Sequence, residues 1–149
     1  MKIIFVCTGN TCRSPMAEAF LKKICEENNV KADILSRGIF AFQGAPVSEY
    51  SAISVKEYGA DVSSHKASQL TEKDIISADY IFTMTKNHKE TIVSSFPQYS
   101  DKVFSISEYT SLPDISDPYG QELEKYLECA KDIYKATEII NLKIFGKKQ

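Results

Sequence analysis

Residues 7–14, "CTGNTCRS", combine a nucleophile with groups that suit an oxyanion. The thiolate of Cys7 can attack phosphorus, and Arg13 carries a planar fork of donors that fits two oxygens of a phosphoryl group. Gly9 lets the backbone bend so that successive N–H groups point to one centre. The spacing therefore predicts nucleophilic attack on a phosphate-sized group that Arg13 and backbone amides hold.

A structural role is the main alternative for Cys7, because a buried cysteine at the end of a strand is usually a small core residue. We favour the catalytic interpretation because Arg13, Gly9 and Asn10 lie in the same short segment. A nucleotide-binding loop is a weaker alternative, since the pattern G-x-x-x-x-G-K-S/T is absent.

The elements on either side of this loop would place it at the edge of a sheet. Residues 2–7, "KIIFVC", read as a buried strand, and residues 15–28 carry apolar side chains at helical spacing. Ser14 is expected to cap this helix, with Pro15 at its first position. The unpaired amides and the dipole of a helix N-terminus favour an anion, here together with Arg13.

The rest of the chain alternates strand-like and helix-like runs. Further strands are expected at 32–36, 78–84 and 102–106, and helices at 48–58, 71–78, 85–95 and about 121–144. This alternation predicts an α/β fold, a single domain over residues 1–149 with a four-stranded parallel sheet and helices on both faces. Its site should lie at the carboxyl ends of the strands.

Composition excludes several functional classes. The 149 residues include 18 basic and 20 acidic side chains, giving a net charge of −2 without long charged runs, so we expect neither nucleic-acid nor membrane binding. The apolar run at the N-terminus is too short for a secretory signal, which predicts a cytoplasmic protein. Free thiols are expected at Cys7, Cys12, Cys25 and Cys129, without metal-ligand spacing. We also expect a monomer.

The segment "CTGNTCRSPMAEA" at 7–19 resembles the active-site loop of the low-molecular-weight protein phosphatase family. The likeness continues in the family's order through "SRG" at 36–38, "SSHKA" at 63–67, "ADYIFTM" at 78–84 and "SDPYG" at 116–120. This resemblance implies the same four-stranded parallel fold and a cysteine-dependent phosphatase that acts on phosphorylated proteins.

Cleavage of a P–O or P–N bond requires a proton for the leaving group, which a carboxylic acid can supply. Asp114 and Asp117 both qualify from the sequence alone, and the resemblance places the general acid on Asp117. The implied mechanism has two steps: Cys7 becomes phosphorylated, and water then hydrolyses the intermediate with Asp117 as base. Neither a metal nor an organic cofactor is expected, because Arg13 and the loop amides supply the electrostatic stabilisation.

The resemblance also implies a supporting hydrogen-bond network around the loop, formed by Asn10, Ser14, Ser36 and His65. Ser14 is further expected to donate to Cys7. The full set of candidate phosphate- and substrate-binding residues is Thr8, Gly9, Asn10, Thr11, Cys12, Ser14 and Tyr119. Cys12 either fills space or forms a reversible disulfide with Cys7 that protects it from overoxidation.

Substrate choice is expected to depend on Thr11. Tyrosine-directed members usually carry an aliphatic residue at the matching position, whereas the protein arginine phosphatase branch carries threonine. Phosphoarginine is therefore the predicted substrate and phosphotyrosine the alternative. Tyr119, with Phe42 as a candidate second wall, would flank the substrate side chain. Arg37 stands where the family commonly has a small residue, and its orientation is open.

Two other functions compete with a phosphatase. An arsenate reductase would also use Cys7 as nucleophile but needs resolving thiols, for which Cys12 alone is a weak basis. A phosphopeptide-binding module would keep the anion site but has no need for both Cys7 and Asp117. The phosphatase interpretation is therefore preferred.

Overall fold

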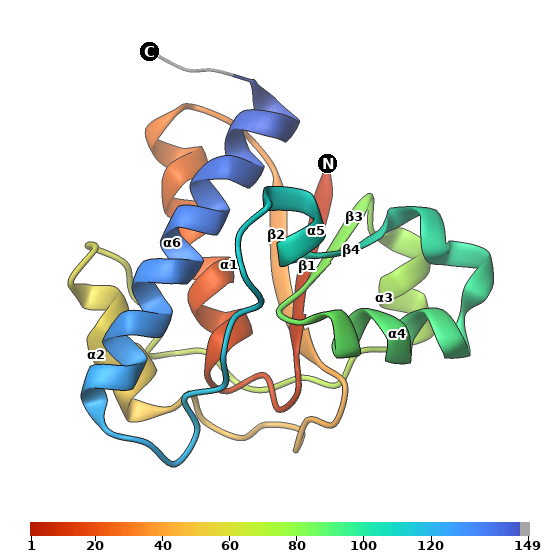
Figure 1. Ribbon diagram of the computed structural model, residues 1–149. Helices are drawn as coiled ribbons and strands as arrows, with labels where there is room; N and C mark the ends of the chain where they lie inside the picture. Colours follow the sequence, from red (N-terminus) through yellow and green to blue (C-terminus); the bar gives the residue numbers. More distant parts are fainter. Residues whose placement is uncertain (147–149) are drawn as a thin grey trace.

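A four-stranded parallel sheet forms the centre of the computed structural model, which describes residues 1–146 (Figure 1). Its strands are β1 (Lys2–Cys7), β2 (Asp33–Gly38), β3 (Tyr80–Thr83) and β4 (Val103–Ser105). They lie in the order β2-β1-β3-β4, so β1 pairs with both β2 and β3. The predicted α/β class with a parallel sheet is confirmed.

Helices cover both faces of this sheet (Figure 1). The helices α1 (Arg13–Glu27), α2 (Glu49–Lys56) and α6 (Leu123–Phe145) pack over the face that carries Ile3, Phe5 and Cys7. The helices α3 (Glu72–Ser77) and α4 (Lys86–Ser95) pack over Ile4 and Val6 on the opposite face. This division follows from the alternation of side chains along β1.

The first turn of α1 corrects one prediction. The helix begins at Arg13 rather than at Pro15, and Cys12 occupies the N-cap position without a side-chain hydrogen bond to the turn. Ser14 therefore does not cap the helix, because it lies inside the first turn and its hydroxyl contacts Cys7 and Asn10 instead.

Other differences lie at element ends and in short helices. The strand β2 extends to Gly38, two residues beyond the predicted end, because Gly38 pairs with Cys7 at the carboxyl end of β1. The short helices η1 (Pro97–Lys102) and α5 (Ile106–Thr110) were not predicted, since both are too short for a clear apolar period.

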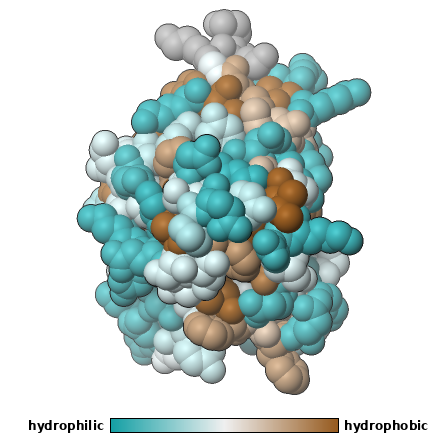
Figure 2. Space-filling model, turned by 90° about the vertical axis from the view of Figure 1, so that its right-hand side faces the viewer, coloured by the Kyte–Doolittle hydropathy of each residue, from teal (hydrophilic) through white to brown (hydrophobic). Residues whose placement is uncertain are grey.

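The long helix α6 confirms the predicted amphipathic C-terminal segment, with Ala130, Ile133 and Ile140 fully buried against α1 and the sheet. Within residues 1–146, no helix is both long and apolar enough to cross a membrane. Figure 2, which faces the side of α3 and α4, shows a largely hydrophilic surface with small, separate apolar areas.

The strand order explains where the site forms. The chain leaves β1 through α1 to reach β2 on one side, whereas β3 pairs with the other side of β1. The carboxyl ends of β1 and β3 therefore meet where the strand order reverses, which is where open α/β sheets form their binding crevices. Residues 8–12 follow β1 at this point, and the first turn of α4 follows β3.

Candidate active site

A pocket of about 230 Å³ opens at the carboxyl end of β1. Its wall consists of candidate site residues from the loop and from the 114–120 segment, namely Cys7, Thr8, Gly9, Thr11, Cys12, Arg13, Asp117 and Tyr119. The structure thus brings together the predicted nucleophile, cation and acid, although they are separated by up to 110 positions in the sequence (117 − 7).

Cys7 lies at the end of β1 with only 2% of its surface exposed. Its Sγ atom is 2.9 Å from Oγ of Ser14, and Asn10 Nδ2 donates a hydrogen bond to that same oxygen at 2.8 Å. The Ser14 hydroxyl also lies 3.4 Å from the carbonyl oxygen of Arg37. Ser14 therefore joins the nucleophile to Asn10 and to the end of β2.

Asn10 connects the loop to two other segments. It is fully buried with φ of 60°, a left-handed conformation that asparagine tolerates better than most residues. Nδ2 also donates to Ser36 Oγ at 3.0 Å, and Oδ1 accepts from the Ser68 amide at 2.8 Å. His65 Nε2 lies 2.9 Å from the carbonyl oxygen of Asn10. The predicted supporting residues therefore meet around one asparagine.

The network continues to Glu18, which the sequence analysis missed. Ser36 Oγ donates to Glu18 Oε1 at 2.6 Å, and Lys22 Nζ lies 2.6 Å from Glu18 Oε2. Glu18 follows Ser14 by one helical turn on α1, so the two residues share a helix face. The spacing between Ser14 and Glu18 was the only sequence feature that linked Glu18 to the loop. It could not predict a role for Glu18 without knowledge of where Ser36 lies.

Arg13 is 4% exposed and is held from the opposite wall of the pocket. Nη1 donates to the carbonyl oxygen of Ile115 at 2.9 Å, and Nη2 lies 3.7 Å from Oδ2 of Asp117. Asp114 instead accepts a hydrogen bond from the backbone amide of Lys86 at 3.2 Å. The structure therefore places Asp117 at the pocket and Asp114 at the N-terminus of α4.

The rim of the pocket carries Thr11 and Tyr119. Tyr119 is 76% exposed. Its backbone amide donates a hydrogen bond to Oδ1 of Asp117 at 3.1 Å, which places the backbone of Tyr119 next to the carboxylate. Phe42 is 83% exposed and is not part of this wall, so the expectation of a second wall there is wrong. Phe40, two residues earlier, lines an adjoining pocket instead.

Cys12 shares the pocket with Cys7 and lies between two hydroxyl groups. Its Sγ is 3.8 Å from Oγ1 of Thr11 and 3.8 Å from the phenol oxygen of Tyr126 on α6. Burial raises the pKa of Cys129, also on α6, to about 12, so that thiol stays protonated. The redox role of Cys12 stays a prediction.

Arg37, whose orientation the sequence left open, points away from the pocket. Its Nε lies 3.1 Å from Oδ2 of Asp74 on α3, and Nη1 donates to the Ser36 carbonyl at 2.8 Å. Arg37 therefore joins β2 to α3.

His88 is a second residue that the sequence analysis missed. Its Nε2 lies 2.9 Å from Oγ1 of Thr8, the residue after Cys7, and its Nδ1 lies 3.0 Å from Oγ1 of Thr85. Burial, with a smaller contribution from the nearby charge of Arg13, lowers the pKa of His88 to about 4. A histidine in the first turn after β3 was the available signal, because β3 neighbours β1.

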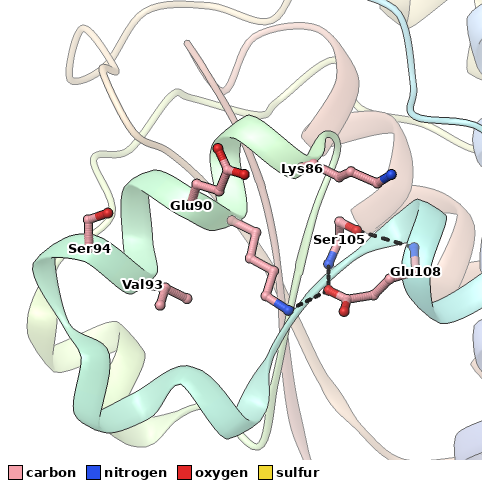
Figure 3. A pocket seen from close by; sticks show the side chains of 7 residues that line it. Lys86, Glu90, Val93, Ser94, Ser105 and Glu108 are labelled. Carbon is pink, nitrogen blue, oxygen red and sulfur yellow. Dashed lines mark hydrogen bonds and ion pairs between the residues drawn. The ribbon is translucent and has the colours of Figure 1, made fainter.

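A separate groove of about 370 Å³ lies along α4 (Figure 3). Lys89 Nζ donates to Glu108 Oε2 at 2.6 Å, and the same carboxylate oxygen accepts from the amide of Ser105, the N-cap of α5. Figure 3 shows Ser105 and Glu108, at the start of α5, on the side of the groove that faces α4. These contacts join α4 to the start of α5.

Comparison with known proteins is consistent with this geometry. Residues 2–148 match the family described as low molecular weight phosphotyrosine protein phosphatase. A protein-arginine-phosphatase of Bacillus subtilis (strain 168) is 42% identical over 139 residues, covering 92% of this chain and 87% of the relative.

Two solved phosphatase structures are similar to this chain over nearly its whole length. A low molecular weight protein tyrosine phosphatase from T. tengcongensis superposes with a TM-score of 0.93 and 40% identity, covering 97% of this chain and 99% of the other. A mutant of the YwlE arginine phosphatase with a phosphorylated active-site serine superposes with a TM-score of 0.89 and 36% identity, covering 97% of each chain.

Proposed function

This chain belongs to the low molecular weight phosphotyrosine protein phosphatase family and is a cysteine-dependent phosphatase, and we propose that it hydrolyses phosphoarginine in proteins through phosphorylated Cys7. The observation that carries the proposal is the pocket itself, in which Cys7, Arg13 and Asp117 surround a space of about 230 Å³ with Thr11 at its rim.

In the first step, the Cys7 thiolate attacks phosphorus, so that an S–P bond forms while the bond from phosphorus to the guanidine nitrogen breaks. Asp117 gives its proton to that nitrogen, and the arginine side chain departs as guanidinium. Arg13 and the amides of residues 8–13 stabilise the charge on the phosphoryl oxygens. The Ser14 hydroxyl, 2.9 Å from the sulfur, holds the nucleophile in place.

In the second step, water attacks the phosphorus of the cysteinyl-phosphate. Asp117, now a carboxylate, accepts a proton from the water as the new P–O bond forms and the P–S bond breaks. Inorganic phosphate leaves, and Cys7 returns as a thiolate next to the Ser14 hydroxyl. The related structure with a phosphorylated active-site serine supports a covalent phosphoryl group at this position.

Thr11 and Asp117 support a guanidinium substrate over a phenol. A threonine at the rim is smaller than isoleucine and offers a hydroxyl to a planar polar group. Asp117, with 53% of its side chain exposed, becomes a carboxylate when it gives up its proton and can then pair with the leaving guanidinium. The relative named protein-arginine-phosphatase supports the same choice.

Phosphotyrosine remains the second candidate, favoured by the exposed ring of Tyr119 at the rim and by the tyrosine phosphatase among the similar structures. Arsenate reduction has less support, because Cys25 and Cys129 are buried outside the pocket and only Cys12 accompanies Cys7 there. The cytoplasmic location and the monomeric state remain predictions.

The deciding experiment compares kcat/KM on a phosphoarginine peptide and on a phosphotyrosine peptide of the same sequence. We expect a preference for phosphoarginine that falls by about tenfold or more in Thr11→Ile, because a change of this size alters discrimination by about 10–200-fold. Thr11→Val separates the loss of the hydroxyl from the added bulk. A preference for phosphotyrosine in the unmodified protein would overturn the substrate assignment and leave the cysteine mechanism standing.

A further inference from the structure

A chain of three side chains joins α4 to the residue beside the nucleophile. Thr85, the N-cap of α4, accepts a hydrogen bond from the backbone amide of His88 at 3.2 Å and lies 3.0 Å from Nδ1 of the same residue. Nε2 on the other side of the ring lies 2.9 Å from Oγ1 of Thr8. The imidazole therefore bridges two hydroxyl groups.

The proton positions on Thr85, His88 and Thr8 can be assigned by counting hydrogen-bond donors and acceptors. If Nδ1 carried the proton, Thr85 Oγ1 would accept both from this nitrogen and from the amide of His88, and the Thr8 hydroxyl would donate its proton to Nε2. If Nε2 carries the proton, Thr85 donates to Nδ1, Nε2 donates to Thr8, and the Thr8 proton is free. Only the second arrangement leaves a donor for the pocket.

A Thr8 hydroxyl whose proton is not used by His88 can donate a hydrogen bond to a bound phosphoryl group. Thr8 lines the pocket that holds Cys7 and Arg13, and it also lines the adjoining pocket of about 270 Å³ in which His88 forms part of the wall. A hydrogen bond to a charged phosphoryl oxygen is stronger than one between neutral groups. An anion in the pocket therefore favours the arrangement in which Thr8 donates.

We propose that His88 is a positioning residue for phosphate binding, which donates from Nε2 to Thr8 and so directs the Thr8 proton toward an oxygen of the bound phosphoryl group. The inference rests on the proposed function, because the anion it serves is the phosphoryl group attacked by Cys7. It adds a side-chain donor to the loop amides and Arg13.

The surroundings of the ring support its neutral form. Burial is the largest cause of the lowered pKa of His88, and Arg13 on α1 acts in the same direction, whereas Asp117 and Asp114 oppose it. A neutral imidazole has one N–H and one acceptor nitrogen, as a directed bridge between two hydroxyls requires. A doubly protonated ring would lose the acceptor that receives the Thr85 proton.

The first test measures the dissociation constant of inorganic phosphate by titration calorimetry, which requires no turnover. We expect Thr8→Val to weaken binding by about tenfold, because it removes a hydrogen bond to a charged group without changing side-chain shape. Thr8→Ser should bind like the unmodified protein. Thr91→Val is the matched control on α4, since the Thr91 hydroxyl donates to the Asn87 carbonyl rather than to the loop.

A double-variant cycle then tests whether His88 acts through Thr8. His88→Leu should weaken phosphate binding by about as much as Thr8→Val, and the double variant should be no weaker than either single variant. His88→Gln, which keeps a donor near the position of Nε2, should restore part of the affinity. Additive losses, or tight phosphate binding in Thr8→Val, would overturn the proposal.

The tautomer provides a readout that a purely structural role would not produce, and it is available even if His88→Leu does not fold. The ring nitrogen shifts of His88 in the NMR spectrum of the phosphate-bound protein should show the proton on Nε2, and a proton on Nδ1 would disprove the assignment. These binding results stand apart from the proposed function, which fails separately if Cys7→Ser retains full turnover.

Discussion

At the scale of single residues, the pocket works through the direction of its hydrogen bonds. The Asn10 amide donates to Ser14, whose hydroxyl contacts the Cys7 sulfur and the Arg37 carbonyl oxygen. The Asn10 oxygen is occupied by the Ser68 amide, so the side chain cannot rotate without breaking a buried contact. The hydroxyl next to the nucleophile is therefore held in position by the surrounding residues.

Substitution of the acid and substitution of the nucleophile should have different effects on kcat and on phosphate affinity. Asp117→Asn should lower kcat by about 10²–10⁴-fold, because it removes the proton donor, with a much smaller change in phosphate affinity. Cys7→Ser should abolish turnover while retaining phosphate or vanadate binding. Steady-state kinetics and calorimetry together check both results.

Asp114→Asn is the control for the acid, since Asp114 contacts the Lys86 amide outside the pocket. It should leave kcat within about threefold of the unmodified protein, as expected for a surface change of small free energy. Equal losses in the Asp114 and Asp117 variants would contradict the assignment of the general acid.

His88 should make stability depend on pH. The pKa of His88 is about 4 in the folded protein, whereas its ordinary value is 6.5. Burial lowers this pKa most and the charge of Arg13 lowers it further, whereas the charges of Asp117 and Asp114 raise it. Below pH 6.5 the unfolded chain therefore binds a proton that the folded chain does not, so stability falls as the pH decreases toward 4. Between pH 7 and pH 5 this loss is about 2 kcal/mol.

Urea unfolding at both pH values checks this prediction. The unmodified protein should lose about 2 kcal/mol more than His88→Gln over the same interval, since glutamine does not titrate. Identical losses in the two proteins would show that His88 titrates normally in the folded state.

At the scale of elements, the end of β2 supports the loop from beneath. Gly38 pairs with Cys7 in the sheet, and a Cβ atom at this position would lie 2.7 Å from the Thr8 carbonyl oxygen and 3.0 Å from the Asn10 amide nitrogen. Both are backbone atoms that cannot move independently of the loop. The absence of a side chain at Gly38 therefore lets β2 and the loop approach closely.

Gly38→Ala should damage both stability and catalysis. Overpacking against the backbone should cost about 1–3 kcal/mol, and displacement of the loop should lower kcat/KM by more than about tenfold. Unfolding and kinetic measurements on one preparation check both effects.

Gly44→Ala distinguishes steric contact from backbone strain. Gly44 has φ of 86°, with open space where a Cβ would lie, so alanine should cost about 1–2 kcal/mol through strain alone while kcat/KM is retained. Normal kcat/KM in Gly38→Ala would show that the close approach of β2 does not set the loop geometry.

At the scale of the whole molecule, an aromatic cluster holds the helices that carry the site. Phe20 on α1 lies 5.0 Å from the ring of Tyr58 and 5.2 Å from the ring of Tyr134 on α6, both in edge-to-face geometry. Phe20 is fully buried and belongs to the core on the Cys7 side of the sheet. The cluster therefore stabilises the packing of α1 against α6 at a distance from the pocket.

Phe20→Ala should lower the free energy of unfolding by about 3–5 kcal/mol, through lost burial and a cavity. Well below the melting temperature, kcat/KM should change little, because the variant retains every residue of the pocket. Phe42→Ala is the exposed control and should unfold like the unmodified protein. A loss below about 1 kcal/mol for Phe20→Ala would mean that the cluster relaxes to fill the space.

Short stretches of the amino-acid sequence were sufficient to predict the local features of the fold and of the phosphate site. The buried strand before Cys7, the anion-binding spacing from Cys7 to Arg13 and the amphipathic stripe of α6 all follow from periods and residue types within short windows. These features were enough to predict the parallel sheet and a phosphate site at the carboxyl end of β1, because side-chain period and connection rules act locally.

The distant residues that contact the loop could be identified only from the three-dimensional structure. It placed Asp117 rather than Asp114 at the pocket, turned Arg37 toward Asp74, and brought Glu18 and His88 into contact with residues that support the site. Hydrogen bonds between segments tens of residues apart have no short-range signature in the sequence. They depend on the order of the strands and on the packing of helices across the sheet, which together determine the distances between side chains.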